Sequence, residues 1–77
     1  MTLFYMHARH DEDQSHDCRV EMRDLQEAKE EIVGYLTETA RDKLVPDRER
    51  QEIVCTLKNA KGDVVLQASL TLQIDGP

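Results

Sequence analysis

The sequence predicts an α+β domain in the order ββαββ, with four antiparallel strands in one sheet and one helix packed on its apolar face. Three observations predict it: one stretch with helical spacing of apolar residues, strand-like alternation on both sides of that stretch, and a glycine-containing turn within the second pair of strands. At 77 residues the chain forms one small domain. A domain of this size buries only about 60% of its unfolded surface, so we expect no large ligand cavity.

The predicted helix spans residues 24–45. Its apolar residues recur at steps of three or four and form one stripe, which consists of Leu25, Ala28, Ile32, Leu36 and Ala40. Asp24 and Glu27 form a pair that resembles a capping box, and Pro46 ends the helix. Gly34 costs about 1 kcal/mol relative to alanine in a helix interior. We interpret it as a tolerated imperfection rather than a point of close backbone approach.

We predict that residues 1–23 form an N-terminal hairpin. The stretch from Thr2 to Arg9 is rich in aromatic and branched residues and predicts a strand, although the alternation leaves open which of its sides faces the core. The segment from His10 to Asp17 is polar and full of turn-forming side chains, so we expect a loop. Cys18, Val20 and Met22 alternate with charged residues, which predicts a half-buried strand that pairs back on the first.

We predict that residues 50–74 form a C-terminal hairpin. Its turn is Asn59 to Gly62, where the glycine can adopt a positive φ. The last strand alternates most clearly, and its core face is expected to consist of Val64, Leu66, Ala68, Leu70, Leu72 and Ile74. The face of the sheet away from the helix is expected to be mildly apolar, through Val54, Thr56, Val65, Ser69 and Thr71. Such a face is either ordinary solvated sheet or a sheet-to-sheet dimer contact, and exposed edge strands could also pair with another chain.

The two cysteines form neither a CxxC pair nor a disulfide framework. Cys18 and Cys55 each fall on the apolar side of a strand pattern, so we expect buried free thiols. No apolar run is long enough to span a membrane, and the run from Leu3 to Met6 is too short for a signal peptide. A cytoplasmic location is therefore the default expectation.

The net charge of −6 is unevenly distributed. Between Asp11 and Glu31 there are nine acidic and three basic residues, whereas the rest of the chain carries seven of each. We expect the acidic loop and the first turns of the helix to form one continuous outward surface. Its predicted partner-binding residues are Asp11, Glu12, Asp13, Asp17, Glu21, Glu27, Glu30 and Glu31.

The chemistry of the chain argues against an enzyme. Ser15, His16 and Asp17 are neighbours in sequence, but a catalytic triad requires three groups that converge in space. No glycine-rich phosphate loop or nucleophile elbow is present, and we expect no cofactor. The acidic loop lacks the central glycine and terminal glutamate of a calcium-binding EF-hand. Weak metal binding through His10 and His16 is an alternative, although their spacing matches no established zinc pattern.

Three segments carry a resemblance to a known family, and they are LFYMHAR (residues 3–9), RDLQEAKEE (residues 23–31) and NAKGDVVLQASL (residues 59–70). They resemble a family of short proteins of unknown function that is common in rhizobia and related alphaproteobacteria. The similarity spans most of the chain, and it departs from the family pattern where His10 and Arg19 stand near the places of first-hairpin glycines. The resemblance implies the same fold and no particular activity.

Direct binding to nucleic acid is disfavoured because the chain lacks a basic stripe. The charge pattern instead predicts a non-enzymatic module that binds a basic protein surface. In its most concrete form the protein is an inhibitor that occupies the nucleic-acid-binding surface of its partner, as anti-CRISPR proteins do. The alternative is a homo-oligomeric accessory protein, such as a homodimer, whose charge serves solubility.

Overall fold

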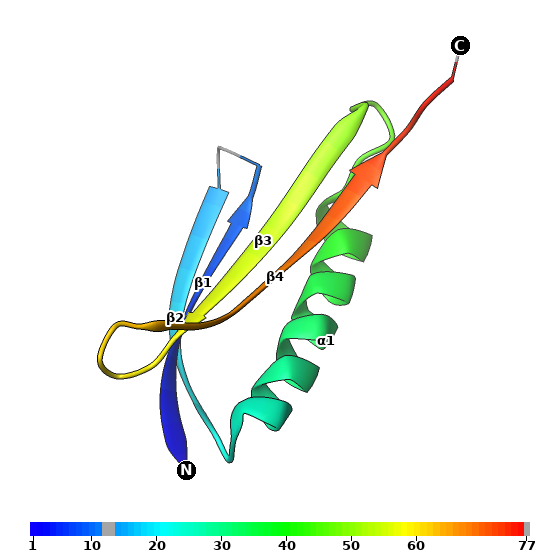
Figure 1. Cartoon of the computed structure of the whole chain (residues 1–77). Helices are drawn as coiled ribbons and strands as arrows, with labels where there is room; N and C mark the ends of the chain where they lie inside the picture. Colours follow the sequence, from blue (N-terminus) through cyan, green and yellow to red (C-terminus); the bar gives the residue numbers. More distant parts are fainter. Residues whose placement is uncertain (12–13, 77) are drawn as a thin grey trace.

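The computed structural model describes residues 1–11 and 14–76 of the chain. The elements follow the order ββαββ (Figure 1), and they are β1 (Thr2–His10), β2 (Gln14–Met22), α1 (Leu25–Lys43), β3 (Arg50–Lys58) and β4 (Val64–Gln73). The strands form one antiparallel sheet in the order β2-β1-β3-β4. The predicted α+β fold is therefore confirmed.

The helix begins where the capping signal predicts. The Oδ1 atom of Asp24 accepts a hydrogen bond from the backbone N–H of Glu27 at 2.9 Å. The helix ends at Lys43, two residues before the predicted boundary, and Leu44 is already extended. Pro46 disfavours helical conformation in the residue before it, which accounts for the early end. No helix in the described part of the chain is long and apolar enough to span a membrane.

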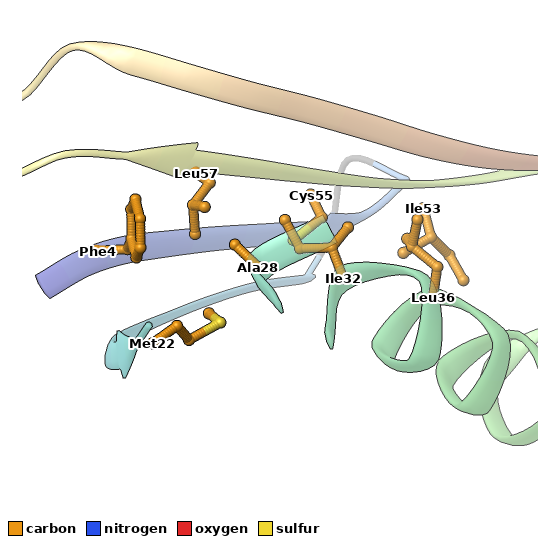
Figure 2. Close-up of a cluster of buried hydrophobic side chains, with 8 residues drawn as sticks. All are labelled: Phe4, Met22, Ala28, Ile32, Leu36, Ile53, Cys55 and Leu57. Carbon is orange, nitrogen blue, oxygen red and sulfur yellow. The ribbon is translucent and has the colours of Figure 1, made fainter. Parts of the chain in front are cut away.

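The core lies between α1 and the sheet (Figure 2), and its members are Phe4, Met22, Ala28, Ile32, Leu36, Ile53, Cys55 and Leu57. Phe4 and Ala8 are buried, so this side of β1 faces the core and the orientation of the first strand is settled. A Cβ atom placed at Gly34 would meet nothing within 4 Å. The glycine is thus a tolerated imperfection and not a point of close approach.

The first hairpin is longer than the sequence predicts. Its strands continue through His10 and resume at Gln14, so the expectation of a loop from His10 to Asp17 is wrong. Polar residues in this stretch face one another across the strands, as His7 and Asp17 do, with Nδ1 and Oδ1 2.6 Å apart. Pairs of polar side chains across two strands stabilise a solvent-exposed part of a sheet. Such a strand can therefore form without alternating apolar residues.

The face of the sheet away from α1 carries Val54, Thr56, Ser69 and Thr71 as predicted, but it also carries charged residues that the prediction left out. His7 and Asp17 lie on it, and so do Arg9 and Glu52, whose charged groups are 4.0 Å apart. Val54 and Thr56 are only half-buried there. Most of these residues come from β1 and β2, and Glu52 comes from β3.

The second hairpin contains one irregularity that the alternation did not reveal. The register shifts at Leu57 and Lys58, where β4 accommodates an extra residue. Val65 consequently packs against the core, although it was predicted on the outer face, and Val64 is 58% exposed. The turn itself is as predicted, with Gly62 at a φ of +88°.

The molecule is elongated, with extents of 49 × 21 × 17 Å. The end of β1 and Asp11 lie at one end of the molecule, together with the C-terminus of α1 and the start of β3 (Figure 1). We call this the turn end. The end of β2 and the first turns of α1 lie at the other, which we call the helix-start end.

Candidate protein-binding surface

The predicted acidic residues do not form one surface. Asp11 lies at the turn end, whereas Glu27, Glu30 and Glu31 lie at the helix-start end. The nine residues of β2 run between the two ends. At about 3.3 Å per residue that strand spans roughly 26–30 Å. The expectation of a continuous acidic surface is therefore wrong, and Glu12 and Asp13 lie outside the described residues.

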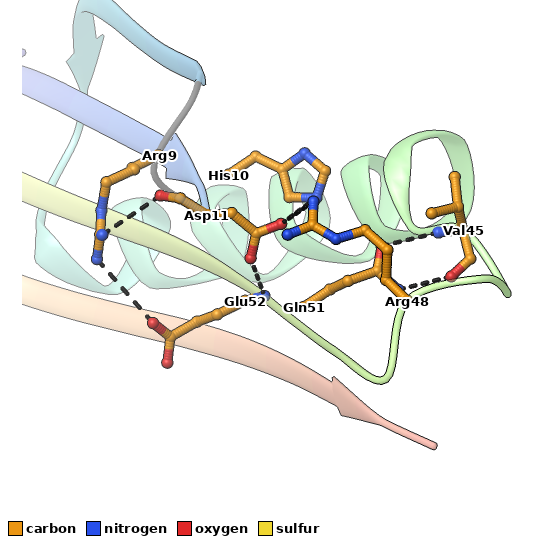
Figure 3. A network of polar contacts seen from close by, with 7 residues as sticks. All are labelled: Arg9, His10, Asp11, Val45, Arg48, Gln51 and Glu52. Atoms are coloured by element: carbon orange, nitrogen blue, oxygen red, sulfur yellow. Dashed lines mark hydrogen bonds and ion pairs between the residues drawn. The ribbon is translucent and has the colours of Figure 1, made fainter. Parts of the chain in front are cut away.

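Asp11 is a structural residue (Figure 3). Its backbone N–H donates to the carbonyl oxygen of Glu52 at 2.9 Å, and its Oδ1 accepts from the backbone N–H of Glu52 at 2.9 Å. Its Oδ2 lies 2.9 Å from Nη1 of Arg48, and the side chain is only 15% exposed. The residue has a φ of +55°, a conformation that aspartate adopts more readily than most residues. Asp11 therefore ties the first turn to β3 and offers little charge to a partner.

His10 belongs to the same network. Its Nε2 lies 3.5 Å from Oδ2 of Asp11, and neither buried atom has a well-aligned hydrogen bond. The contact between Arg48 and Asp11 is thus a close ion pair rather than an aligned hydrogen bond. His16 is exposed, and within residues 1–11 and 14–76 no three His, Cys, Asp or Glu side chains gather as metal ligands would.

Gln51 is a residue whose role the sequence analysis missed. Its side chain is fully buried at the start of β3. Its Oε1 accepts from the N–H of Val45 at 2.8 Å, and its Nε2 donates to the carbonyl oxygen of Val45 at 2.6 Å. The side chain thereby holds the segment after α1 against the sheet. The alternation of β3 contains the signal, since Gln51 has the same parity as Ile53 and Cys55.

Two further acidic residues have partners within the chain. Asp17 pairs with His7 on the outer face of the first hairpin. Glu27 forms a hydrogen-bonded ion pair with Arg23 one helical turn before it, and this bond raises the pKa of Arg23. Glu21 is exposed near the end of β2. The remaining predicted residues, Glu30 and Glu31, are exposed on α1, and none of the ion pairs between described residues includes them.

A hollow lies beside the acidic start of the helix. It has a volume of about 400 Å³ and is lined by Met6, Val20, Glu21, Met22, Glu27, Glu31, Ile32 and Tyr35. It exists because α1 lies mainly over β3 and β4 and leaves part of the first hairpin uncovered. Carboxylates therefore border an apolar patch of the half-buried Met6, Val20 and Tyr35 and the buried Met22 and Ile32.

A second hollow of about 250 Å³ continues on the far side of Tyr35, towards the turn end. Its walls include His10 and His16 from the first hairpin and Lys43 from the last turn of α1. Since Tyr35 lines both hollows, we describe them together as the β1–β2 groove. The groove is acidic at the helix-start end and basic at the turn end.

The geometry of β2 also bears on catalysis. Ser15, His16 and Asp17 are consecutive residues of this strand. Successive side chains of a strand point to opposite faces, so His16 lies on the other face from Ser15 and Asp17. These three residues cannot form a triad.

Comparison with known proteins gives one match. No curated protein and no solved structure is similar to the chain. A family model described as "Domain of unknown function (DUF6894)" matches residues 3–71. The match covers most of the chain and agrees with the predicted membership in an uncharacterised family. The protein belongs to the DUF6894 family.

Proposed function

We propose that the protein is a non-enzymatic binding module that takes a basic, amphipathic segment of a partner protein into the β1–β2 groove. One observation carries this proposal: Glu27 and Glu31 border the apolar side chains of Met6, Val20 and Met22 in a single hollow. Apolar side chains of the partner would fill the hollow, and neighbouring lysines or arginines would meet the carboxylates. This is the chemistry by which amphipathic segments bind grooves in other proteins.

The electrostatic part of the proposal rests on Glu31, which lines the hollow, and on the neighbouring Glu30, which lies outside it on the exposed face of α1. Both are exposed, and neither takes part in an ion pair between described residues. Glu27 is only 23% exposed and already pairs with Arg23, so it contributes less. With a net charge of −6, the chain would attract a basic partner over a distance set by the ionic strength.

The narrower proposal is an inhibitor that covers the nucleic-acid-binding surface of its partner, as an anti-CRISPR protein does. The net charge supports it. Its support from geometry is smaller than the sequence suggested, because Asp11 pairs with Arg48 and Asp17 pairs with His7. A cytoplasmic location and an alphaproteobacterial origin belong to the same proposal.

The test measures binding of a fluorescein-labelled amphipathic peptide of lysine and leucine by fluorescence polarisation. We expect the double variant Glu30→Lys with Glu31→Lys to bind at least tenfold more weakly, about 1.4 kcal/mol. The matched control, Asp63→Lys with Asp75→Lys, makes the same charge change at two exposed residues outside the groove, one just before β4 and one just after it. It should lose no more than about threefold, because charge outside the groove acts only through screened, long-range attraction.

A peptide with the same composition in scrambled order separates groove binding from simple charge attraction. It keeps its positive charge but loses its apolar face, so we expect weak binding that disappears in high salt. Equal binding of the two peptides would contradict the groove, and equal losses in the two double variants would contradict the role of Glu30 and Glu31. For the inhibitor, DNA should compete with the protein for a partner captured from the host.

A further inference from the structure

The two edges of the sheet differ in how well they are protected. The order β2-β1-β3-β4 leaves β2 and β4 at the edges, and among the described residues no strand pairs with the outer side of β4. The ten residues of β4 include no charged residue and no proline. Native proteins usually protect a long edge strand with such residues. By contrast, β2 carries Asp17, Arg19 and Glu21.

The backbone groups that β4 leaves open can be identified. The N–H of Ile74 donates to the carbonyl oxygen of Glu49 at 2.8 Å, one step beyond the register pair of Arg50 and Gln73. In an antiparallel pair, hydrogen-bonded and non-hydrogen-bonded residues alternate. The even-numbered residues from Leu66 to Leu72 therefore bond to β3. The odd-numbered residues from Gln67 to Gln73 direct their N–H and C=O groups away from the sheet.

We propose that β4 pairs antiparallel with β4 of a second copy, about a two-fold axis through Ser69, to form one sheet of both copies. Ser69 lies midway between Val64 and Ile74, so this register gives the longest overlap. It places Ser69 opposite Ser69 and Gln67 opposite Thr71, and all of these residues have outward backbone groups. Each strand thereby satisfies the other's free donors and acceptors.

The side chains also match in this register. On the face that carries α1, Ala68 would lie opposite Leu70 and Leu66 opposite Leu72, so apolar residues meet apolar residues. On the other face, polar pairs of serine, threonine and glutamine would meet, and such cross-strand pairs stabilise sheets by a few tenths of a kcal/mol or more each. A closed two-fold pair uses the same surface on both copies and leaves no β4 edge for further growth.

Charge explains why a second copy fits this edge and no other. Two chains with a net charge of −6 repel each other, but β2 and its acidic residues lie at the opposite edge of the sheet. Three strand spacings separate β2 from β4, which is about 14 Å. Pairing through β4 therefore keeps the acidic hairpins of the two copies at the outer edges of the joint sheet.

The helix flank above β4 agrees with this arrangement. At 100° per residue, Gln26, Lys29, Val33 and Thr37 lie on the opposite flank of α1 from the groove-lining Glu31 and Tyr35. The charged residues on this side are Lys29 and, at its solvent-exposed border, Glu30, so their charges cancel, and Val33 is 58% exposed. The two-fold axis brings the two flanks towards each other, so the exposed valines face a neutral surface.

The experiment is sedimentation velocity from low micromolar to near-millimolar concentration. We expect a species of twice the 8.9 kDa chain mass. Ser69→Lys puts like charges opposite each other, and Ser69→Pro removes an outward N–H without disturbing the bonds to β3. Each should raise the dimer dissociation constant at least tenfold with an unchanged circular dichroism spectrum. The control Ser15→Lys alters an exposed serine on the other edge strand and should leave the dimer intact.

A charge-exchange pair tests the register. In the proposed pairing, Gln67→Glu with Thr71→Lys gives each new glutamate a lysine on the other copy, so the dimer persists. Gln67→Lys with Thr71→Lys gives lysines opposite lysines, and the dimer dissociates. A wild-type chain that stays monomeric throughout overturns the proposal, and so does a dimer that survives both Ser69 variants. Peptide binding in the β1–β2 groove should not change in the Ser69 variants, which keeps the two proposals separately testable.

Discussion

The two hairpins of this protein share one sheet but have different roles. In the second hairpin, Leu57 is fully buried beneath α1. Its register neighbour in the first hairpin, Met6, is only half-buried and lines the β1–β2 groove. The difference follows from the position of the helix, which lies mainly over β3 and β4. Stability is therefore concentrated in the covered hairpin, and free surface for binding is left on the other.

The charges follow the same division. The first hairpin and the start of α1 contain most of the excess negative charge, but part of it is matched within the chain by Arg48 and Arg23. The strand β4 carries no charge at all. Net charge along a sequence is thus a poor guide to the charge that a partner meets. The available charge is what remains after partners within the chain are counted.

The largest effect that separates the two hairpins concerns Leu57 and Met6. Leu57→Ala should destabilise the fold by about 3–4 kcal/mol, because it removes a fully buried side chain and leaves a cavity. Met6→Ala should cost only about 1–2 kcal/mol, since solvent already reaches the groove. Urea unfolding followed by circular dichroism measures both values. If both substitutions lower the free energy of unfolding equally, the two hairpins contribute equally to the core.

Most of the fold could be predicted from the sequence because most elements bury one face. The helix and β3 each show an apolar period that matches their geometry, and Asp24 marks the start of the helix. The ends of β1 and β2 were missed because their residues are polar on both faces, as around His10 and Ser15. Their strand conformation comes from cross-strand pairing, and no periodicity reveals that. The bulge in β4 was missed for a similar reason, since it leaves the alternation intact on either side.

The candidate site was predicted less well, because in-chain pairing depends on contacts between distant residues. Nothing near Asp11 in the sequence shows that Arg48 and Glu52 would surround its carboxylate. The prediction of one continuous acidic surface also relied on closeness in sequence. Asp11 and Glu27 are near in sequence, but they lie at opposite ends of the strand β2. Glu30 and Glu31 were identified as acidic surface residues, and their exposure agrees. The apolar hollow beside them was not expected for a chain of this size.

A smaller effect concerns Gln51, which links the covered hairpin to the end of α1. Gln51→Ala should destabilise the fold by about 2 kcal/mol, because both polar groups of Val45 lose their partner in a partly buried place. Gln73→Ala is the matched control on β4, where the side chain is exposed and its Nε2 donates to Asp75 at 3.2 Å. It should change the free energy of unfolding by less than about 0.5 kcal/mol. If Gln51→Ala leaves the free energy of unfolding unchanged, water replaces the hydrogen bonds that the side chain makes to Val45.

The smallest effect is seen at alkaline pH and compares the two cysteines. Both thiols are free, and Cys55 is buried in the covered hairpin whereas Cys18 is half-buried in the open one. Burial raises the pKa of Cys55 from 9.0 to about 11, because the thiolate would lose its hydration. The unfolded chain therefore loses this proton at lower pH than the native chain, so the contribution of Cys55 to stability is complete below pH 9 and is lost as the pH rises towards 11.

At pH 10 the expected loss is about 1.4 kcal/mol, which corresponds to one pH unit above the unfolded pKa. Lysines and tyrosines also titrate in this range, so the measurement is the difference between the wild type and Cys55→Ala in urea unfolding at pH 8 and pH 10. The variant should lose less stability than the wild type over this interval. If Cys55→Ala and the wild type lose the same stability, burial does not hold the proton on Cys55, and the second hairpin is less well covered than its packing indicates.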